Sequence, residues 1–89
     1  MEINYTGHNI EVTAAIKEHT DKKFVRVFNH GANITSISIS FSIEKNEQIA
    51  KVNIHIPGHE IFAHNSSDDL YKSIDGLVDK VLIQLDKHK

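Results

Sequence analysis

The segment Ile34–Glu44, ITSISISFSIE, decides the fold class because its apolar and polar residues alternate. Serines occupy most of one side of the segment, and the other side carries Ile37, Ile39, Phe41 and Ile43. A period of two with one polar side is the pattern of a β-strand that is buried on one face only. The sequence therefore predicts a sheet that is covered on one side.

Two more strands are predicted to follow this segment through tight turns. Lys45-Asn46-Glu47 turns the chain, and the core side of the next strand is expected to carry Val52, Ile54 and Ile56. Pro57-Gly58 predicts a second turn into the strand HEIFAHN (59–65), whose core side is expected to carry Ile61 and Ala63. Hairpin-linked strands with polar outward residues indicate a sheet whose helices lie on the same face.

Two helices are predicted from apolar residues at helical spacing. Thr13 is the expected N-cap of a helix that runs to about His30. Ser66 and Asp69 resemble a capping box, which predicts that a final helix begins there and continues to the end of the chain. Gly76 lies inside this helix, where a glycine is expected to permit close packing.

The remaining strand is predicted at the N-terminus, in EINYT (2–6), and Thr6-Gly7-His8-Asn9 is expected to form the turn after it. The element order is then β-α-β-β-β-α. We predict an α+β fold, a two-layer sandwich with a four-stranded sheet and both helices on one face, resembling a double-stranded RNA-binding domain. Residues 1–89 are predicted to form a single domain, because the length suits one and no linker is visible.

The composition is that of an ordinary soluble protein, with 39% hydrophobic and 25% charged residues. Neither a transmembrane helix nor a secretory signal is expected from the sequence. The chain has no cysteine, which excludes disulfides and thiolate metal sites. These features favour a cytoplasmic protein with no membrane partner. The net charge of −2 is unusual for a nonspecific duplex binder, which is normally basic overall.

Charged residues are sorted around both predicted helices when they are placed at about 100° per residue. One flank of the first helix carries His19, Lys22, Lys23, Arg26 and His30. In the last helix one flank carries Ser73, Lys80, Gln84 and Lys87, and the other carries Asp75, Asp79 and Asp86. This sorting predicts two rows of cations. Closely spaced cationic side chains of this kind bind phosphate groups. An ordinary solvated face is the alternative.

Three segments resemble the short ribosome hibernation promoting factors of bacteria, also called sigma-factor modulation proteins. They are INYTGHNIEVTAAIKEH (3–19), VNIHIPGHEIFAHN (52–65), and DLYKSIDGLVDK followed by QLDKHK (69–80 and 84–89). The resemblance implies a translation silencer and not an enzyme, with no cofactor and no small-molecule substrate. It implies binding to the small ribosomal subunit, over ribosomal RNA, in the messenger RNA and transfer RNA channel at the A and P sites.

The resemblance also implies that the protein inhibits translation and promotes inactive ribosome dimers in stationary phase or stress. Short members act together with a separate ribosome modulation factor. Because this chain stops directly after its last predicted helix, it resembles the short, pairing-promoting form.

By position, the basic helix residues of this family fall on Lys17, Lys23, Arg26, Lys80, Lys87 and Lys89, and Lys22 adds to the first row. The predicted set that contacts ribosomal RNA is Lys22, Lys23, Arg26, Lys80, Lys87 and Lys89. Two departures weaken the second row. Ile83 stands where relatives often have arginine, and Asp86 places an acid beside Lys87.

Two other classes of function stay open. A generic double-stranded RNA-binding domain needs lysines where the last helix begins, but this chain has acids there. A protein-interaction regulatory module would use Ile83 and Val25 as exposed contacts. Among the seven histidines, His55, His59 and His64 are expected near one another, yet no ligand spacing supports a metal site, and none is predicted. No catalytic residue is predicted, because no nucleophile–base pair can be assembled.

Overall fold

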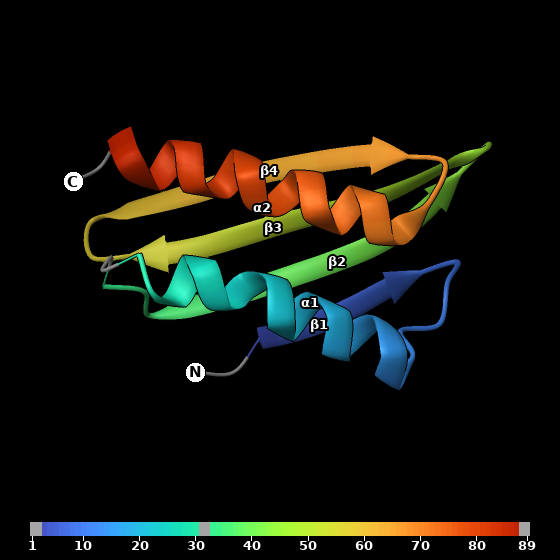
Figure 1. Cartoon of the computed structure of the whole chain (residues 1–89), viewed down its shortest axis with the longest axis horizontal. Helices are drawn as coiled ribbons and strands as arrows, with labels where there is room; N and C mark the ends of the chain where they lie inside the picture. Colours follow the sequence, from blue (N-terminus) through green and yellow to red (C-terminus); the bar gives the residue numbers. More distant parts are fainter. Residues whose placement is uncertain (1–2, 31–32, 88–89) are drawn as a thin grey trace.

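Six elements make up the part of the chain that the computed structural model describes, residues 3–30 and 33–87. They are β1 (Ile3–His8), α1 (Ala14–Phe28), β2 (Ser36–Glu44), β3 (Glu47–Ile56), β4 (His59–Ser67) and α2 (Leu70–Lys87). The four strands form one sheet in the order β1-β2-β3-β4, in which β1 is parallel to β2 and the later pairs are antiparallel (Figure 1). The predicted element order and fold class are confirmed.

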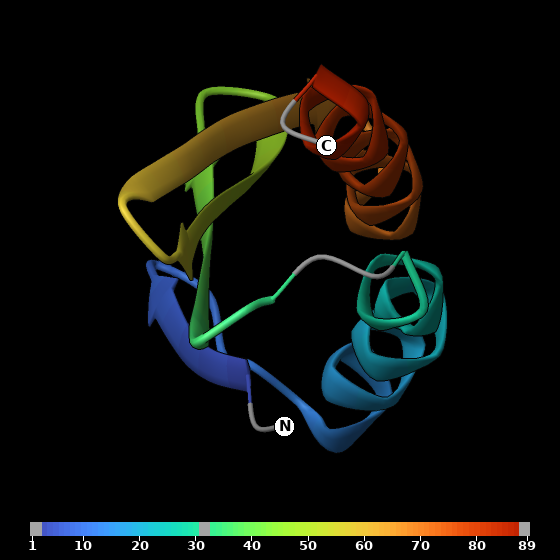
Figure 2. The same cartoon turned by 90° about the vertical axis from the view of Figure 1, so that its left-hand side faces the viewer.

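Both helices cover the same face of this sheet. Figure 2 shows the sheet as one layer, α1 and α2 as the other, and the far face of the sheet without a helix. The connection from β1 through α1 to the parallel strand β2 requires a crossover, and this places α1 over the sheet. α2 follows β4 and lies beside α1, and the two helices run in the same direction along the sheet (Figure 1).

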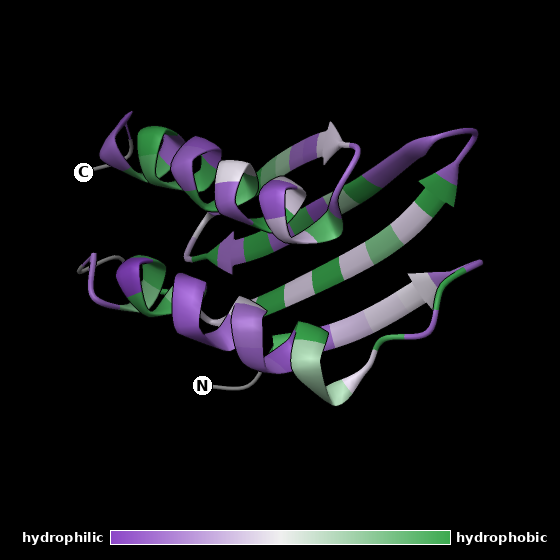
Figure 3. Cartoon of the chain, turned by 45° about the vertical axis from the view of Figure 1, so that its right-hand side comes forward, coloured by the Kyte–Doolittle hydropathy of each residue, from purple (hydrophilic) through white to green (hydrophobic). Residues whose placement is uncertain are grey.

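The core lies between the two layers and follows the predicted alternation. Figure 3 shows hydrophobic and hydrophilic residues alternating along β2. Ile37, Ile39 and Phe41 are buried under the helices, whereas the serines between them lie on the open face. The other large side chains that are fully buried are Phe24, Val27, Ile54, Ile61, Ile74, Leu77, Val78, Val81 and Leu85.

α1 begins where the sequence predicts and ends slightly earlier. The side chain of Thr13 caps the helix, since its Oγ1 accepts a hydrogen bond from the backbone N–H of Ile16 at 3.3 Å. The helix ends at Phe28, and the N–H of Asn29 closes it on the carbonyl of Val25 at 2.9 Å. The expected end near His30 is therefore two residues too late.

The predicted capping box of α2 is wrong. Ser66 belongs to β4, and Asp69 is the capping residue, because its carboxylate accepts the N–H of Tyr71 at 3.0 Å. Ser73 is also misplaced by the sequence analysis, which put it on the lysine flank. It is fully buried, and its Oγ donates to the carbonyl oxygen of Gln48 at 2.7 Å, which ties α2 to β3.

α2 packs closely on β4, as the mid-helix glycine predicts. A Cβ atom at Gly76 would clash with the side-chain amide of Asn65, which donates to the carbonyl oxygen of Ser73 at 3.1 Å. Glycine at this position therefore lets the helix approach the edge strand and leaves room for an amide that anchors it. This approach brings the lysine flank of α2 to the edge of the sheet.

β1 is longer than predicted and needs a glycine near its end. Thr6 to His8 continue the pairing with β2, so the expected turn at these residues is wrong. The positive φ of 62° at Asn9 marks the position where the chain leaves the strand. At Gly7 a Cβ atom would clash with the backbone carbonyl oxygen of Ile10, so the return of the chain over β1 leaves no space for a side chain.

We expect Gly7→Ala to lower the free energy of unfolding by about 1–3 kcal/mol, because backbone must move to admit the methyl group. Asn4→Ala is the matched control on the same strand, since Asn4 is exposed, and we expect a change within about 0.5 kcal/mol. Urea denaturation monitored by circular dichroism measures both. Equal unfolding midpoints for Gly7→Ala and the wild-type chain would show that the loop after β1 is not packed as described.

Candidate functional site

An interhelical seam of basic and acidic side chains joins α1 to α2. The bases of α1 that reach it are His19, Lys23, Arg26 and His30, and the acids of α2 are Asp75, Asp79 and Asp86. The N–O distances are 3.0 Å for His19–Asp75, 3.8 Å for Lys23–Asp75, 3.5 Å for Arg26–Asp79 and 2.7 Å for His30–Asp86. Each of the four bases therefore contacts an acid of α2, and these contacts follow the length of both helices.

The spacing of these residues explains why the two rows meet. The bases recur at intervals of four, three and four residues, and the acids recur at four and then seven, so each row follows one side of its helix. Because the helices run in parallel, the first base meets the first acid and the last base meets the last acid. Asp75 contacts both His19 and Lys23, so one carboxylate of α2 faces two bases of α1.

The seam changes how the first predicted row of cations is read. The sorted charges of α1 suggested an open row of cations, but Lys23 and Arg26 each face a carboxylate. Lys22 is exposed and makes no ion pair within the described part of the chain. The structure therefore divides this row into one unpaired cation and two paired ones.

The paired cations of the seam are held only weakly. The side chains of Lys23, Arg26, Asp75 and Asp79 are between 44% and 66% exposed. Ion pairs in contact with water contribute about 0–1 kcal/mol each, which is less than the 1.5–3 kcal/mol typical of a hydrogen bond to a charged group. Lys23 and Arg26 can therefore exchange a carboxylate for a phosphate oxygen at low cost, although the carboxylates that stay nearby oppose the exchange.

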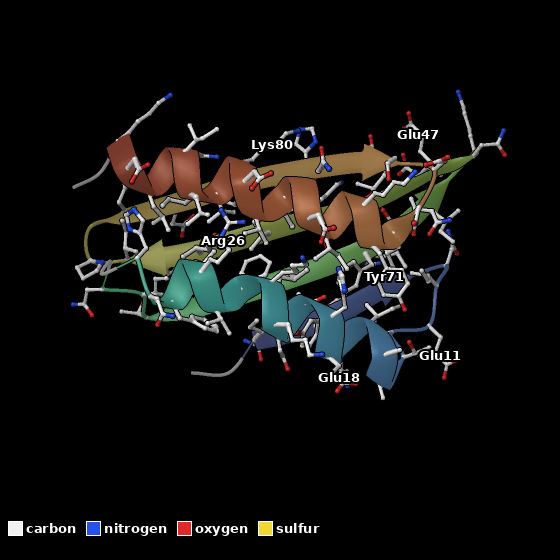
Figure 4. The ribbon with its side chains drawn as sticks, in the orientation of Figure 1. Glu11, Glu18, Arg26, Glu47, Tyr71 and Lys80 are labelled. Atoms are coloured by element: carbon white, nitrogen blue, oxygen red, sulfur yellow. The ribbon has the colours of Figure 1, made fainter. Side chains whose placement is uncertain are left out.

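The second predicted row lies on the opposite flank of α2. Figure 4 shows Arg26 on α1 and Lys80 on the side of α2 that borders β4, so α2 itself separates the two rows. The Nζ of Lys80 donates to the backbone carbonyl oxygen of His64 at 2.9 Å, and Lys87 is exposed in the last helical turn. Neither lysine contacts a carboxylate in residues 3–30 and 33–87. Lys89 lies outside the described residues.

The open face of the sheet carries polar side chains and one exposed aromatic ring. Phe62 is 61% exposed on β4, and its partner across the strands is Asn53 of β3. His55 pairs with Glu60 at 3.3 Å, and His64 lies opposite Lys51. Among the described residues, no three potential ligands come close enough together to hold a metal ion.

Tyr5 connects β1 to α1 and does not belong to the charged surface. Its hydroxyl donates to the carboxylate of Asp21 and lies 3.3 Å from the carbonyl oxygen of Lys17. Burial, followed by the hydrogen bond to Asp21 and the charge of that carboxylate, raises the pKa of Tyr5 far above its usual value of about 10. The phenol therefore stays neutral, and Asp21 is engaged in packing the helix onto the sheet.

Sequence reasoning identified the cations but missed what three of the acids do. It placed Asp75, Asp79 and Asp86 together on one flank, but it did not place that flank against the cations of α1. The matching intervals of the two rows carried this information in part. The sequence does not show that the two helices lie side by side and run in the same direction. That arrangement depends on how the chain crosses the sheet.

Comparisons with known proteins agree with this architecture. Residues 3–89 match the model of the Sigma 54 modulation protein / S30EA ribosomal protein family. The ribosome hibernation promoting factor of Klebsiella oxytoca is 42% identical over 89 residues, which are 100% of this chain and 94% of that protein.

Two solved structures are also similar. One is a ribosomal subunit interface protein from Coxiella burnetii, with a TM-score of 0.89, 35% identity, and coverage of 99% of this chain and 97% of that one. The other is the N-terminal domain of Thermus thermophilus Protein Y, with a TM-score of 0.90, 25% identity and full coverage of both chains.

Proposed function

This chain belongs to the Sigma 54 modulation protein / S30EA ribosomal protein family, and we propose on that premise that it is a ribosome hibernation factor that binds the small ribosomal subunit. The observation that carries the proposal is the identity of 42% to a ribosome hibernation promoting factor along the whole of this chain. The similarity to a ribosomal subunit interface protein supports the same partner. The protein would regulate translation in the cytoplasm. Within the described residues, neither helix is long and apolar enough to cross a membrane.

The proposed contacts to ribosomal RNA are the cations of the helical layer. They comprise Lys22, Lys23, Arg26, Lys80 and Lys87, together with Lys89 beyond the described residues. Lys22 and Lys87 are exposed without an acidic partner in the described chain, and Lys80 has two ammonium donors left after its bond to His64. Phosphate contacts of this kind position a protein on structured RNA without reading base sequence.

The proposed mechanism is occupancy. Residues 1–89, acting as one domain, would fill the channel of the small subunit that messenger RNA and transfer RNA use at the A and P sites. Translation then stops because the template and the adaptors have no room, and the idle ribosomes form inactive dimers in stationary phase or stress. A separate ribosome modulation factor would act on the same ribosomes. No chemical step is needed, so neither a cofactor nor a catalytic residue is part of the proposal.

Co-sedimentation with isolated small subunits, over a series of salt concentrations, tests the proposal. We expect retention that falls steeply with salt, because each phosphate contact releases a counterion on binding. With the six proposed contacts, the slope of log K against log salt should be roughly −5. An arbitrary RNA duplex of equal charge is the control and should bind far more weakly. Equal affinity for that duplex would favour a generic double-stranded RNA binder.

A protein-interaction module is the second candidate, and one observation favours it. Val25 is 48% exposed on α1 and Ile83 is 59% exposed on α2, so apolar side chains stand on the helical layer. If the amount of protein retained on ribosomes does not depend on the salt concentration, the protein-interaction module is favoured over binding through phosphate contacts.

A further inference from the structure

The two most exposed large apolar side chains of the described residues line one hollow. Phe62 is 61% and Ile83 is 59% exposed, and both border a hollow of about 330 Å³ where the free edge of β4 meets α2. The other lining residues are Ala63, His64, Lys80 and Gln84. Exposed apolar surface with a polar rim is typical of a binding site, and the volume falls in the lower range of small-ligand pockets.

Two backbone carbonyls of this edge are already occupied, which disfavours an added β-strand at the hollow. β4 is the last strand of the sheet, and edge strands normally offer free carbonyl groups to a partner. Here the carbonyl of Phe62 accepts the side-chain amide of Gln84 at 2.7 Å, and the carbonyl of His64 accepts the ammonium of Lys80 at 2.9 Å. Recognition at the hollow must therefore use side chains.

The electrostatics of the hollow favour an anionic ligand. None of its lining residues is acidic, and the ammonium of Lys80 has two hydrogen-bond donors left after its contact with His64. Lys87 lies two helical turns further along the same flank and extends the positive charge past the hollow. In contrast, the cations of the interhelical seam face carboxylates, as Lys23 and Arg26 do.

We propose that this hollow holds one unpaired nucleotide of ribosomal RNA, with its base against Phe62 and Ile83 and its phosphate at Lys80. A nucleotide offers the flat apolar face of its base and a charged phosphate a few ångströms away, which is the combination that the lining residues match. Gln84 keeps one N–H donor and its carbonyl acceptor for the edge of the base. The inference rests on the proposed function and names the nucleotide-binding part of the surface.

The test compares Phe62→Ala with Ile43→Ala for binding to small subunits. Both side chains are exposed, so both variants should fold like the wild-type chain by urea denaturation. We expect Phe62→Ala to weaken binding about 5- to 150-fold, the range found when a base-stacking aromatic is removed. Ile43→Ala should stay within about twofold, because Ile43 lies on β2 and away from the hollow. Phe62→Trp should restore affinity, since tryptophan also stacks on bases.

Chemical probing of the bound ribosomal RNA identifies the occupant. At saturating protein, one or two unpaired nucleotides should be altered by the wild-type chain and keep their free-subunit reactivity with Phe62→Ala. Wild-type affinity in Phe62→Ala would overturn the nucleotide site and leave the proposed function standing. Weaker binding with an unchanged reactivity pattern would place a ribosomal protein at the hollow and also overturn it. Failure of the wild-type chain to co-sediment would overturn the proposed function and this site together.

Discussion

Asp75→Asn with Asp79→Asn is expected to tighten binding to the small ribosomal subunit, whereas Lys23→Gln with Arg26→Gln is expected to weaken it about 100-fold or more. Both double variants remove the Lys23–Asp75 and Arg26–Asp79 ion pairs of the interhelical seam, and Asp75→Asn also changes the contact of Asp75 with His19. Loss of the two shared ion pairs therefore affects helix packing in both variants alike. Their opposite effects on binding would isolate the contribution of the cations.

The expected directions follow from competition for the cations. Lys23 and Arg26 must leave their carboxylates to reach phosphate, and this costs up to about 1 kcal/mol for each exposed pair. Asparagine removes that cost and the repulsion between carboxylate and phosphate, so the affinity should rise by up to about 30-fold. Glutamine removes two charged hydrogen bonds to phosphate, worth about 1.5–3 kcal/mol each.

The salt dependence separates this mechanism from a change in fold. For Lys23→Gln with Arg26→Gln, the slope of log K against log salt should become shallower by about two, because two phosphate contacts are lost. The aspartate variant should keep the wild-type slope or exceed it. If both double variants bind as the wild-type chain does, Lys23 and Arg26 serve only the seam, and the RNA surface is limited to the unpaired lysines.

Phe24→Ala should remove a large part of the stability of the domain. The ring of Phe24 is fully buried between α1 and the sheet, and its loss leaves a cavity that the surrounding strands cannot fill. Such replacements cost about 3–5 kcal/mol, and a chain of this length has roughly 4–13 kcal/mol in total. We therefore expect a variant that is partly unfolded at 37 °C and bound by ribosomes only at low temperature.

Val25→Ala is the matched control, because Val25 is the next residue of the same helix and 48% exposed. Its free energy of unfolding should change by less than about 0.5 kcal/mol. Guanidinium denaturation at two temperatures measures both variants. A Phe24→Ala protein as stable as Val25→Ala would mean that α1 does not pack on the sheet as described.

The layer arrangement could be predicted from local pattern alone. The alternation in Ile34–Glu44 requires one buried face and one open face, since a strand of period two cannot bury its serines without hydrogen-bond partners. The helical spacing of apolar residues in α1 and α2 then supplies apolar faces that cover that sheet. Thr13 is confirmed as N-cap for the same reason, because it depends on nearby backbone, and Gly76 is confirmed as a packing glycine against the side chain of Asn65.

The ends of elements were less predictable, because pairing with distant residues decides them. β1 continues through Gly7 and His8, which read as a turn, because β2 offers Phe41 and Ser42 as partners in the parallel register. Ser66 reads as a helix cap but continues β4, where it lies opposite Ile49. Hydrogen bonds between strands that are far apart in sequence override local turn and cap preferences.

The sequence by itself determined the fold class, the family and the sorting of charges around each helix, since all three depend on residue identity and helical or strand period. Only the tertiary structure decided which charges are partnered. Parallel packing of α1 beside α2 sets Lys23 and Arg26 against Asp75 and Asp79, and close packing of α2 on β4 sets Lys80 against the sheet edge. A helical period tells on which side of its own helix a charge lies, but not which element packs against that side.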